Sequence, residues 1–211
     1  MIDMEKSQYR TTNFDLLRHG ECEDGHCYRG SSDVALTNKG LKQMEAGLNK
    51  LNPIWHRVVS SPLLRCSILA KKVSAQHKIP LALDKSLQEM HFGQWEGQAV
   101  QKIWDTQQTL VEAWGVDPVN FPPPDGEAAD IFAARVETAF QHLVDQYVGE
   151  NILLVTHGGV IRVLLAYCLS LSLSKLNRFN IPYACVSRIQ VISDSQSGEK
   201  YYQLLSHNMA E

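Results

Sequence analysis

The chain has 211 residues, of which 44% are hydrophobic, so it is long and apolar enough for one domain with a sizeable core. Its formal net charge of -3 at pH 7 gives no general attraction to nucleic acid or membrane surfaces, and we expect neither as a partner. Five cysteines, no secretory leader and no apolar run long enough to span a bilayer predict a soluble, reduced, cytoplasmic protein.

The first predicted strand contains the apolar run Phe14-Asp15-Leu16-Leu17 and leads directly into Arg18-His19-Gly20-Glu21. Ligands of open α/β sheets bind at the carboxyl ends of strands. An imidazole beside a guanidinium at that position therefore indicates nucleophilic chemistry on an anionic group. Because short motifs also occur by chance, the same residues alone could form a surface turn.

The next predicted element is a helix capped by Thr37. Its apolar residues fall on one stripe, which predicts that one face packs against the sheet; they are Leu41, Met44, Leu48 and Leu51. Asn52-Pro53 is predicted to end this helix.

A short strand at Val58-Val59 precedes a second predicted helix, in which Ser61 is the N-cap, Pro62 is the first residue and the helix runs toward His77. Arg65 then lies in the first turn, where free backbone N–H groups and the helix dipole favour an anion. A cation there opposes the dipole, which suggests a binding role, although a first-turn arginine is often simply solvated.

Residues 81–83 are predicted to form a short strand. The stretch 87–97 that follows contains the carboxylate of Glu89 among apolar side chains. In extended backbone Glu89 and His91 share one face. Glu89 is the better functional candidate of the two. His91 and Trp95 either line a pocket or pack in the core.

The periodicity changes between residues 95 and 127, where two short helices are predicted at 99–114 before a proline-rich segment. Such a cap insertion would cover the site and select the leaving group, because loops over this edge of a sheet often bind ligands. Trp104, Trp114 and Phe121 could face an aromatic or nucleoside-like leaving group. Alternatively they pack the insertion's own small core, and the insertion has no substrate contact.

The second histidine motif follows a long amphipathic helix predicted at 128–147. Residues 152–156 form an apolar strand that runs out into His157-Gly158-Gly159 before another helical pattern. Two strands therefore bring His19 and His157 to one edge of a sheet.

Residues 185–192 and 200–206 are rich in β-formers and flank a turn segment, which predicts a terminal hairpin. Together with the alternating strands and helices, this predicts an α/β fold: a three-layer α/β/α sandwich around a mostly parallel sheet. We expect residues 1–211 to form a single domain.

In combination, these motifs resemble the histidine phosphatase superfamily, the phosphoglycerate-mutase-like fold group, in its smaller phosphatase branch. The matching stretches are residues 17–21, 28–30, 33–37 with Gly40, 61–65, Glu89 with 92–93 and 95–97, and 156–162. The resemblance implies that His19 accepts the phosphoryl group and that Glu89 donates the proton. It also implies that Arg18, Arg65 and His157, with Gly158, hold the phosphoryl oxygens.

Elementary chemistry agrees with these implied roles. A phosphoryl group in transfer spreads negative charge over its oxygens, so positioned positive charge supplies most of the catalysis. Neighbouring cations also lower the pKa of His19 and keep its lone pair free. We expect Glu89 to become protonated mainly in the substrate complex, where a bound phosphate dianion favours its neutral form.

Four positions depart from the family pattern. Cys22 and Gly25 stand where many members have Ser or Thr and Asn, which puts one phosphate contact in doubt unless the Gly25 backbone replaces it. Met90 and Phe92 stand where mutases of the family have Arg and Tyr, which argues against mutase activity.

We also considered two cysteine chemistries. Cys22, Cys27 and His26 near His19 could hold a metal, but their spacing is unlike that of zinc sites, so we predict no metal and no cofactor. A cysteine-dependent phosphatase needs Arg six residues after its cysteine, and none of the five cysteines has one.

The predicted activity is hydrolysis of a small phosphomonoester through phospho-His19. The segment 121–127 and residues 132–136 resemble α-ribazole phosphatases of cobalamin assembly, although these usually have Gly at Asp125 and Ser at Ala128. α-Ribazole 5′-phosphate is therefore the leading substrate, and Arg29 either reaches it or is a solvated loop cation. The alternatives are a broad sugar or nucleotide phosphatase, a mutase, a phosphohistidine-protein phosphatase and a non-catalytic phospho-ligand binder. The sequence leaves the oligomeric state open.

Overall fold

The computed structural model describes residues 8–49, 51 and 54–208. Its centre is a six-stranded sheet with the order β3-β2-β4-β1-β5-β6. The strands are β1 (Tyr9–Arg18), β2 (Arg57–Ser60), β3 (Leu81–Leu83), β4 (Asn151–Thr156), β5 (Val186–Asp194) and β6 (Lys200–His207). Only β5, among these strands, runs against the others, because it pairs antiparallel with both β1 and β6. The sheet is therefore mostly parallel, as predicted.

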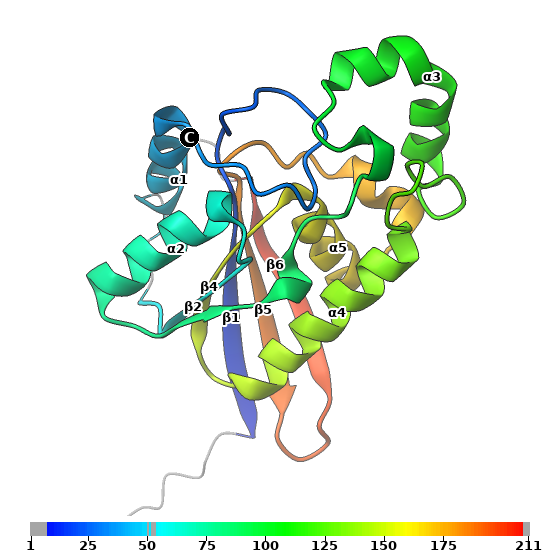
Figure 1. The fold of residues 1–211 in the computed structure, drawn as a ribbon. Coiled ribbons are helices and arrows are strands. Elements are labelled where there is room, and N and C mark those ends of the chain that lie inside the picture. The colour runs from blue at the N-terminus through cyan, green and yellow to red at the C-terminus, as the bar shows by residue number, and fades with distance from the viewer. Residues whose placement is uncertain (1–7, 50, 52–53, 209–211) are drawn as a thin grey trace, which may run out of the picture.

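Helices cover both faces of the sheet (Figure 1). They are α1 (Asn38–Asn49), α2 (Leu64–His77), α3 (Val100–Val116), α4 (Ala129–Gln146) and α5 (Gly158–Cys168), with the 3-10 turns η1 (Lys85–Leu87), η2 (Gly93–Trp95) and η3 (Leu173–Arg178). Side chains alternate along β1, so that Leu16 joins the core under α4 and α5 while Leu17 joins the core under α1 and α2. This arrangement is the predicted three-layer α/β/α sandwich.

The helix starts show one confirmed and one wrong prediction. Thr37 caps α1, since its Oγ1 accepts a hydrogen bond from Gly40 N at 2.9 Å. The prediction that α2 begins at Ser61 and Pro62 is wrong, because Leu63 is its N-cap residue and the backbone N–H of Leu64 donates to Asp33 Oδ1. The predicted end of α1 at Asn52-Pro53 lies outside the described residues.

The segment α3 lies to one side at the end of the molecule where β1 and β4 finish, next to the loop that joins β1 to α1 (Figure 1). Gln107 has non-helical angles inside it, so α3 consists of two short helices across a kink, as the sequence indicated. Backbone hydrogen bonds from Tyr28 N to Gln98 O and from Gly97 N to Tyr28 O join its base to the loop. Among the described helices, none combines the length and the apolar character needed to cross a bilayer.

Candidate active site

The two histidines meet because their strands are neighbours in the sheet. Arg18 pairs with Thr156 at the ends of β1 and β4, so that His19 and His157 follow at adjacent positions. The backbone N–H of His19 donates to Thr156 O at 3.0 Å. Their ring centroids are 5.4 Å apart, and both side chains are buried.

His19 has the protonation state of a nucleophile. Its Nδ1 lies 2.8 Å from the carbonyl oxygen of Gly20, which can only accept a hydrogen bond, so that Nδ1 carries the proton and Nε2 keeps its lone pair. Burial lowers the pKa of His19 well below its usual value, and the positive charges of Arg18 and Arg65 lower it further. The ring is therefore neutral at physiological pH.

His157 has the opposite tautomer. Arg65 Nε donates to His157 Nδ1 at 3.3 Å, so the ring proton is on Nε2, which lies 2.8 Å from Ser61 Oγ. Burial, followed by the charge of Arg65, lowers the pKa of His157 well below its usual value. His157 thus presents an N–H donor, and it is also the N-cap residue of α5.

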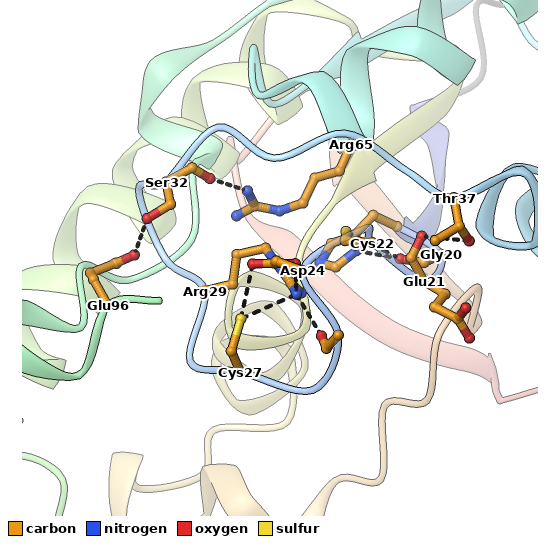
Figure 2. Close-up of polar contacts among 12 residues, drawn as sticks. Gly20, Glu21, Cys22, Asp24, Cys27, Arg29, Ser32, Thr37, Arg65 and Glu96 are labelled. Carbon is orange, nitrogen blue, oxygen red and sulfur yellow. Dashed lines mark hydrogen bonds and ion pairs between the residues drawn. The ribbon is translucent and has the colours of Figure 1, made fainter. Parts of the chain in front are cut away.

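Arg65 is fully buried in the first turn of α2 and is held by the loop after β1. Its guanidinium donates to the carbonyl oxygens of Gly30 and Ser32, both at 2.6 Å. Figure 2 shows Ser32 between Arg65 and Glu96, whose carboxylate accepts from Ser32 Oγ at 2.6 Å. Arg65 is therefore fixed in place before any substrate binds.

Glu96 ties this loop to the segment that carries Glu89. Besides Ser32 Oγ, its carboxylate accepts hydrogen bonds from the backbone N–H groups of Gly30, Ser31 and Phe92. Burial alone would raise the pKa of Glu96, but these hydrogen bonds outweigh it, so the pKa is lowered.

Arg18 and Arg162 both lie close to Gly158. Burial lowers the pKa of Arg18, and its Nε has no hydrogen-bond partner among the described residues, although Nη1 donates to Ile181 O at 2.5 Å. A Cβ atom added to Gly158 would lie 3.3 Å from Arg18 Nε and 3.6 Å from Arg162 Nη1. A buried, unpaired charged donor is costly, and a phosphoryl oxygen would satisfy it.

Glu89 lies against the N-terminus of α5. Its Oε2 accepts from Gly159 N at 2.9 Å, and its Oε1 accepts from Met90 N at 3.1 Å. A Cβ atom at Gly159 would lie only 2.2 Å from Oε1, so the absence of a side chain there makes room for the carboxylate. Glu89 thus contacts the backbone two residues after His157, and its charge acts on Arg18 and Arg162.

Two cavities open at Glu89. The first is mainly apolar, with Met90, Phe92, Trp114 and Phe132 among its lining residues together with Arg162. Trp114 also packs against Tyr28 and Trp95, and its buried Nε1 has no hydrogen-bond partner among the described residues. The second cavity is polar and is lined by Lys85, His91, Asp125, Glu127 and Arg135 with other residues.

The remaining predicted residues have other surroundings. Arg29 is buried rather than solvated and pairs with Asp24 inside its loop, as Figure 2 shows; contact with the substrate stays a prediction. His91 is exposed, and Trp95 is fully buried with its Nε1 donating to Gln107. Trp104 and Phe121 are exposed, so that of the three cap aromatics Trp114 reaches the apolar cavity.

Cys22 and Gly25, the two positions near His19 that depart from the family pattern, both make contacts within the loop after β1. Cys22 is buried, its Sγ lies 3.7 Å from His19 Nδ1, and burial raises the pKa of its thiol. The carbonyl oxygen of Gly25 accepts a hydrogen bond from Arg29 Nη2, and the backbone N–H of Gly25 donates to Cys22 O. Across the part of the chain that the structure describes, no cluster of three or more His, Cys, Asp or Glu side chains could hold a metal ion.

Sequence reasoning missed several residues of this site. Ser61 was assigned to a helix cap but lies against His157, and Arg162 belongs to a recognised motif without having been given a role. Glu96 and Arg135 act on segments distant in the sequence, so no local pattern marks them. Tyr183, whose ring lies 4.5 Å below the Arg18 guanidinium, comes from a loop with no recognisable motif.

Comparison with known proteins agrees with this geometry. Residues 14–203 match the histidine phosphatase superfamily (branch 1). The chain is 31% identical over 179 residues to the adenosylcobalamin/α-ribazole phosphatase of Salmonella typhimurium, covering 83% of this chain and 89% of that protein.

Solved structures show the same likeness. The mycobacterial glucosyl-3-phosphoglycerate phosphatase superposes with a TM-score of 0.84 at 25% identity, over 95% of this chain and all of that one. The α-ribazole phosphatase of Shigella flexneri gives a TM-score of 0.78 at 26% identity, over 93% of this chain and 96% of that one. The chain belongs to the histidine phosphatase superfamily and is a phosphatase with the phosphoglycerate-mutase-like fold.

Proposed function

We propose that this phosphatase hydrolyses small phosphomonoesters through a phosphohistidine on His19. The observation that carries the proposal is the state of that ring: it is buried and neutral, and its Nδ1 is bound to Gly20 O, which leaves Nε2 as the nucleophile. A lowered pKa and a fixed tautomer are the usual means of activating a nucleophile.

The first chemical step forms a bond between His19 Nε2 and phosphorus and breaks the bond to the ester oxygen. Glu89 gives its proton to that oxygen, so the leaving group departs as an alcohol. Arg18, Arg65 and the Nε2–H of His157, once a phosphoryl oxygen replaces Ser61 Oγ as its acceptor, stabilise the negative charge on the three transferring oxygens. The Gly20 carbonyl accepts from Nδ1–H throughout and stabilises the positive charge of the phosphorylated ring.

The second step returns the enzyme to its starting state. Glu89, now a carboxylate, takes a proton from a water molecule whose oxygen attacks phosphorus. The bond from His19 Nε2 to phosphorus breaks, and inorganic phosphate is released. The same carboxyl group therefore serves as acid and then as base.

We further propose α-ribazole 5′-phosphate as the substrate. The leaving group must extend from Glu89, and the apolar cavity that starts there has aromatic walls formed by Phe92, Trp114 and Phe132. A planar benzimidazole base suits such walls, because stacked and edge-on aromatic contacts are favourable. The relative named adenosylcobalamin/α-ribazole phosphatase supports the same choice.

A broad-specificity sugar phosphatase is the second candidate. The polar cavity at Glu89, which includes Lys85, His91 and Asp125, favours a leaving group rich in hydroxyl groups. Met90 and Phe92 line the apolar cavity where mutases have Arg and Tyr, so transfer back to a glycerate is not proposed.

A substrate panel separates the two candidates. We expect kcat/KM for α-ribazole 5′-phosphate to exceed that for glucose 6-phosphate and AMP by about 100-fold or more, which is about 2.7 kcal/mol of transition-state binding. Trp114→Leu should lower kcat/KM for α-ribazole 5′-phosphate about tenfold. The exposed Trp104→Leu in the same helix is the matched control and should change neither value. Equal kcat/KM across the panel would favour the sugar phosphatase.

A further inference from the structure

The segment that carries Glu89 has no regular secondary structure of its own. Residues 88–92 lie between the turns η1 and η2. A proton donor must be held within a fraction of an ångström of its productive position, because proton transfer depends on hydrogen-bond geometry. Some element outside this segment must therefore fix it. We refer to residues 86–91, which include the last two residues of η1, as the acid loop.

Arg135 of α4 holds the acid loop through its carbonyl oxygens. Its Nη1 donates to Ser86 O and Gln88 O, both at 2.9 Å, and its Nη2 donates to Glu89 O at 3.1 Å. Its Nε and Nη2 donate to the two carboxylate oxygens of Glu127 at 2.7 and 2.9 Å. Because a guanidinium has five N–H donors, Arg135 uses all of them in these contacts.

Glu127 holds the acid loop on the C-terminal side of Glu89. Its Oε2 accepts from His91 N at 3.2 Å, and its backbone N–H donates to His91 O at 2.8 Å. The Arg135–Glu127 pair thus contacts the backbone before, at and after Glu89. Glu127 also comes at the end of the segment that leads from α3 to α4, so the pair connects the cap to the acid loop.

We propose that the Arg135–Glu127 pair is a positioning device for the proton donor Glu89. Arg135 has no N–H group left for a substrate, since all five of its donors are used within the protein. The inference rests on the proposed role of Glu89 as the acid. If the pair positions Glu89, weakening it should slow phosphoryl transfer to His19 from substrates whose leaving group needs a proton, and spare transfer from those whose leaving group does not.

Two substrates whose leaving groups differ in their need for a proton can test this expectation. p-Nitrophenolate departs without a proton, whereas an alkoxide such as that of an alkyl phosphate needs one. The test measures kcat/KM on both substrates for Glu89→Gln, Arg135→Lys and Glu127→Gln, because kcat/KM reports phosphoryl transfer to His19 and excludes the later hydrolysis step, which is common to both substrates. Lysine keeps the charge of Arg135 but loses the planar fork that makes five contacts. Glu127→Gln keeps the shape of the side chain. It provides a second test of the pair if Arg135→Lys lowers the yield of folded protein.

We expect Glu89→Gln to lower kcat/KM for the alkyl phosphate at least about 100-fold more than for p-nitrophenyl phosphate. Arg135→Lys and Glu127→Gln should show the same preference at roughly a tenth of that size. The matched control is Arg57→Lys, because Arg57 forms a two-pronged pair with Glu150 and lies over the Tyr147 ring, as Arg135 lies over Phe132. This control should show no leaving-group preference.

Two different failures are distinguishable. If Glu89→Gln shows the preference while Arg135→Lys and Glu127→Gln slow both substrates equally, the pair is only structural and the positioning inference is overturned. If Glu89→Gln itself slows both substrates equally, then the proton-donor role fails and the inference fails with it.

Discussion

His19 and His157 face each other with their ring centroids 5.4 Å apart and their planes inclined by 63°, and they carry their protons on opposite nitrogens. The carbonyl of Gly20 fixes the proton of His19 on Nδ1, whereas the donor Arg65 Nε fixes that of His157 on Nε2. One ring therefore presents a lone pair and the other presents an N–H group. This difference lets two chemically identical side chains serve as nucleophile and as oxyanion donor.

Both rings should stay neutral well into the acidic range. Burial lowers both pKa values in the folded protein below the usual value of 6.5. We expect the NMR signals of both rings to remain unchanged from pH 8 to 5.5. A titration of either buried ring near pH 6.5 would contradict the assigned states.

The same shifts predict how stability depends on pH. Because the unfolded histidines have the higher pKa, the unfolded state binds protons first as the pH falls below about 6.5. The free energy of unfolding should therefore decline below that pH, by at most about 1.4 kcal/mol per pH unit for each ring. Urea unfolding at pH 7.5 and 5.5 would measure the decline, and replacing His19 by Asn should reduce it.

Gly159→Ala should impair catalysis without unfolding the protein. The added Cβ would overlap Glu89 Oε1, which is the flexible end of a side chain, so the carboxylate moves and the backbone stays. We expect kcat on alkyl phosphates to fall about 10- to 100-fold, with the melting temperature lowered by only a few degrees. Gly115→Ala, where no atom lies within 4 Å of the new Cβ, is the control and should retain full activity.

Glu96→Gln should destabilise the protein near neutral pH. The substitution removes the charge that accepts hydrogen bonds from Gly30, Ser31, Ser32 and Phe92, and we expect a loss of about 1–2 kcal/mol. The pKa of Glu96 is lowered in the folded state, so its stabilisation is present above the unfolded pKa and is lost as the pH falls through the folded one. Unfolding curves of both proteins should therefore converge below about pH 4. Curves that stay parallel would mean that the charge of Glu96 has no role.

The sequence predicts this fold well because its signals are local. Each histidine motif follows its apolar strand directly, and parallel strands necessarily end at the same edge of a sheet. The hairpin after residue 185, the kinked α3 and the long α4 follow from turn residues and periodicity in the same way.

The sequence predicts less of the support around the site. The start of α2 is set by Asp33, which reaches the backbone of Leu64 from a distant loop, and this contact overrides the cap signal at Ser61. Arg135 and Glu96 are single polar side chains on otherwise ordinary segments, and their partners are dozens of residues away. Such contacts depend on tertiary structure, so no short pattern can reveal them.

A phosphoenzyme trapped during turnover is the decisive observation for the proposed mechanism. The protein is mixed with a ³²P-labelled phosphomonoester, quenched in alkali within milliseconds and digested. We expect an acid-labile, alkali-stable label on the peptide that contains His19, and no label on a folded His19→Asn variant. A label on any other residue, or normal turnover by His19→Asn, would contradict the mechanism.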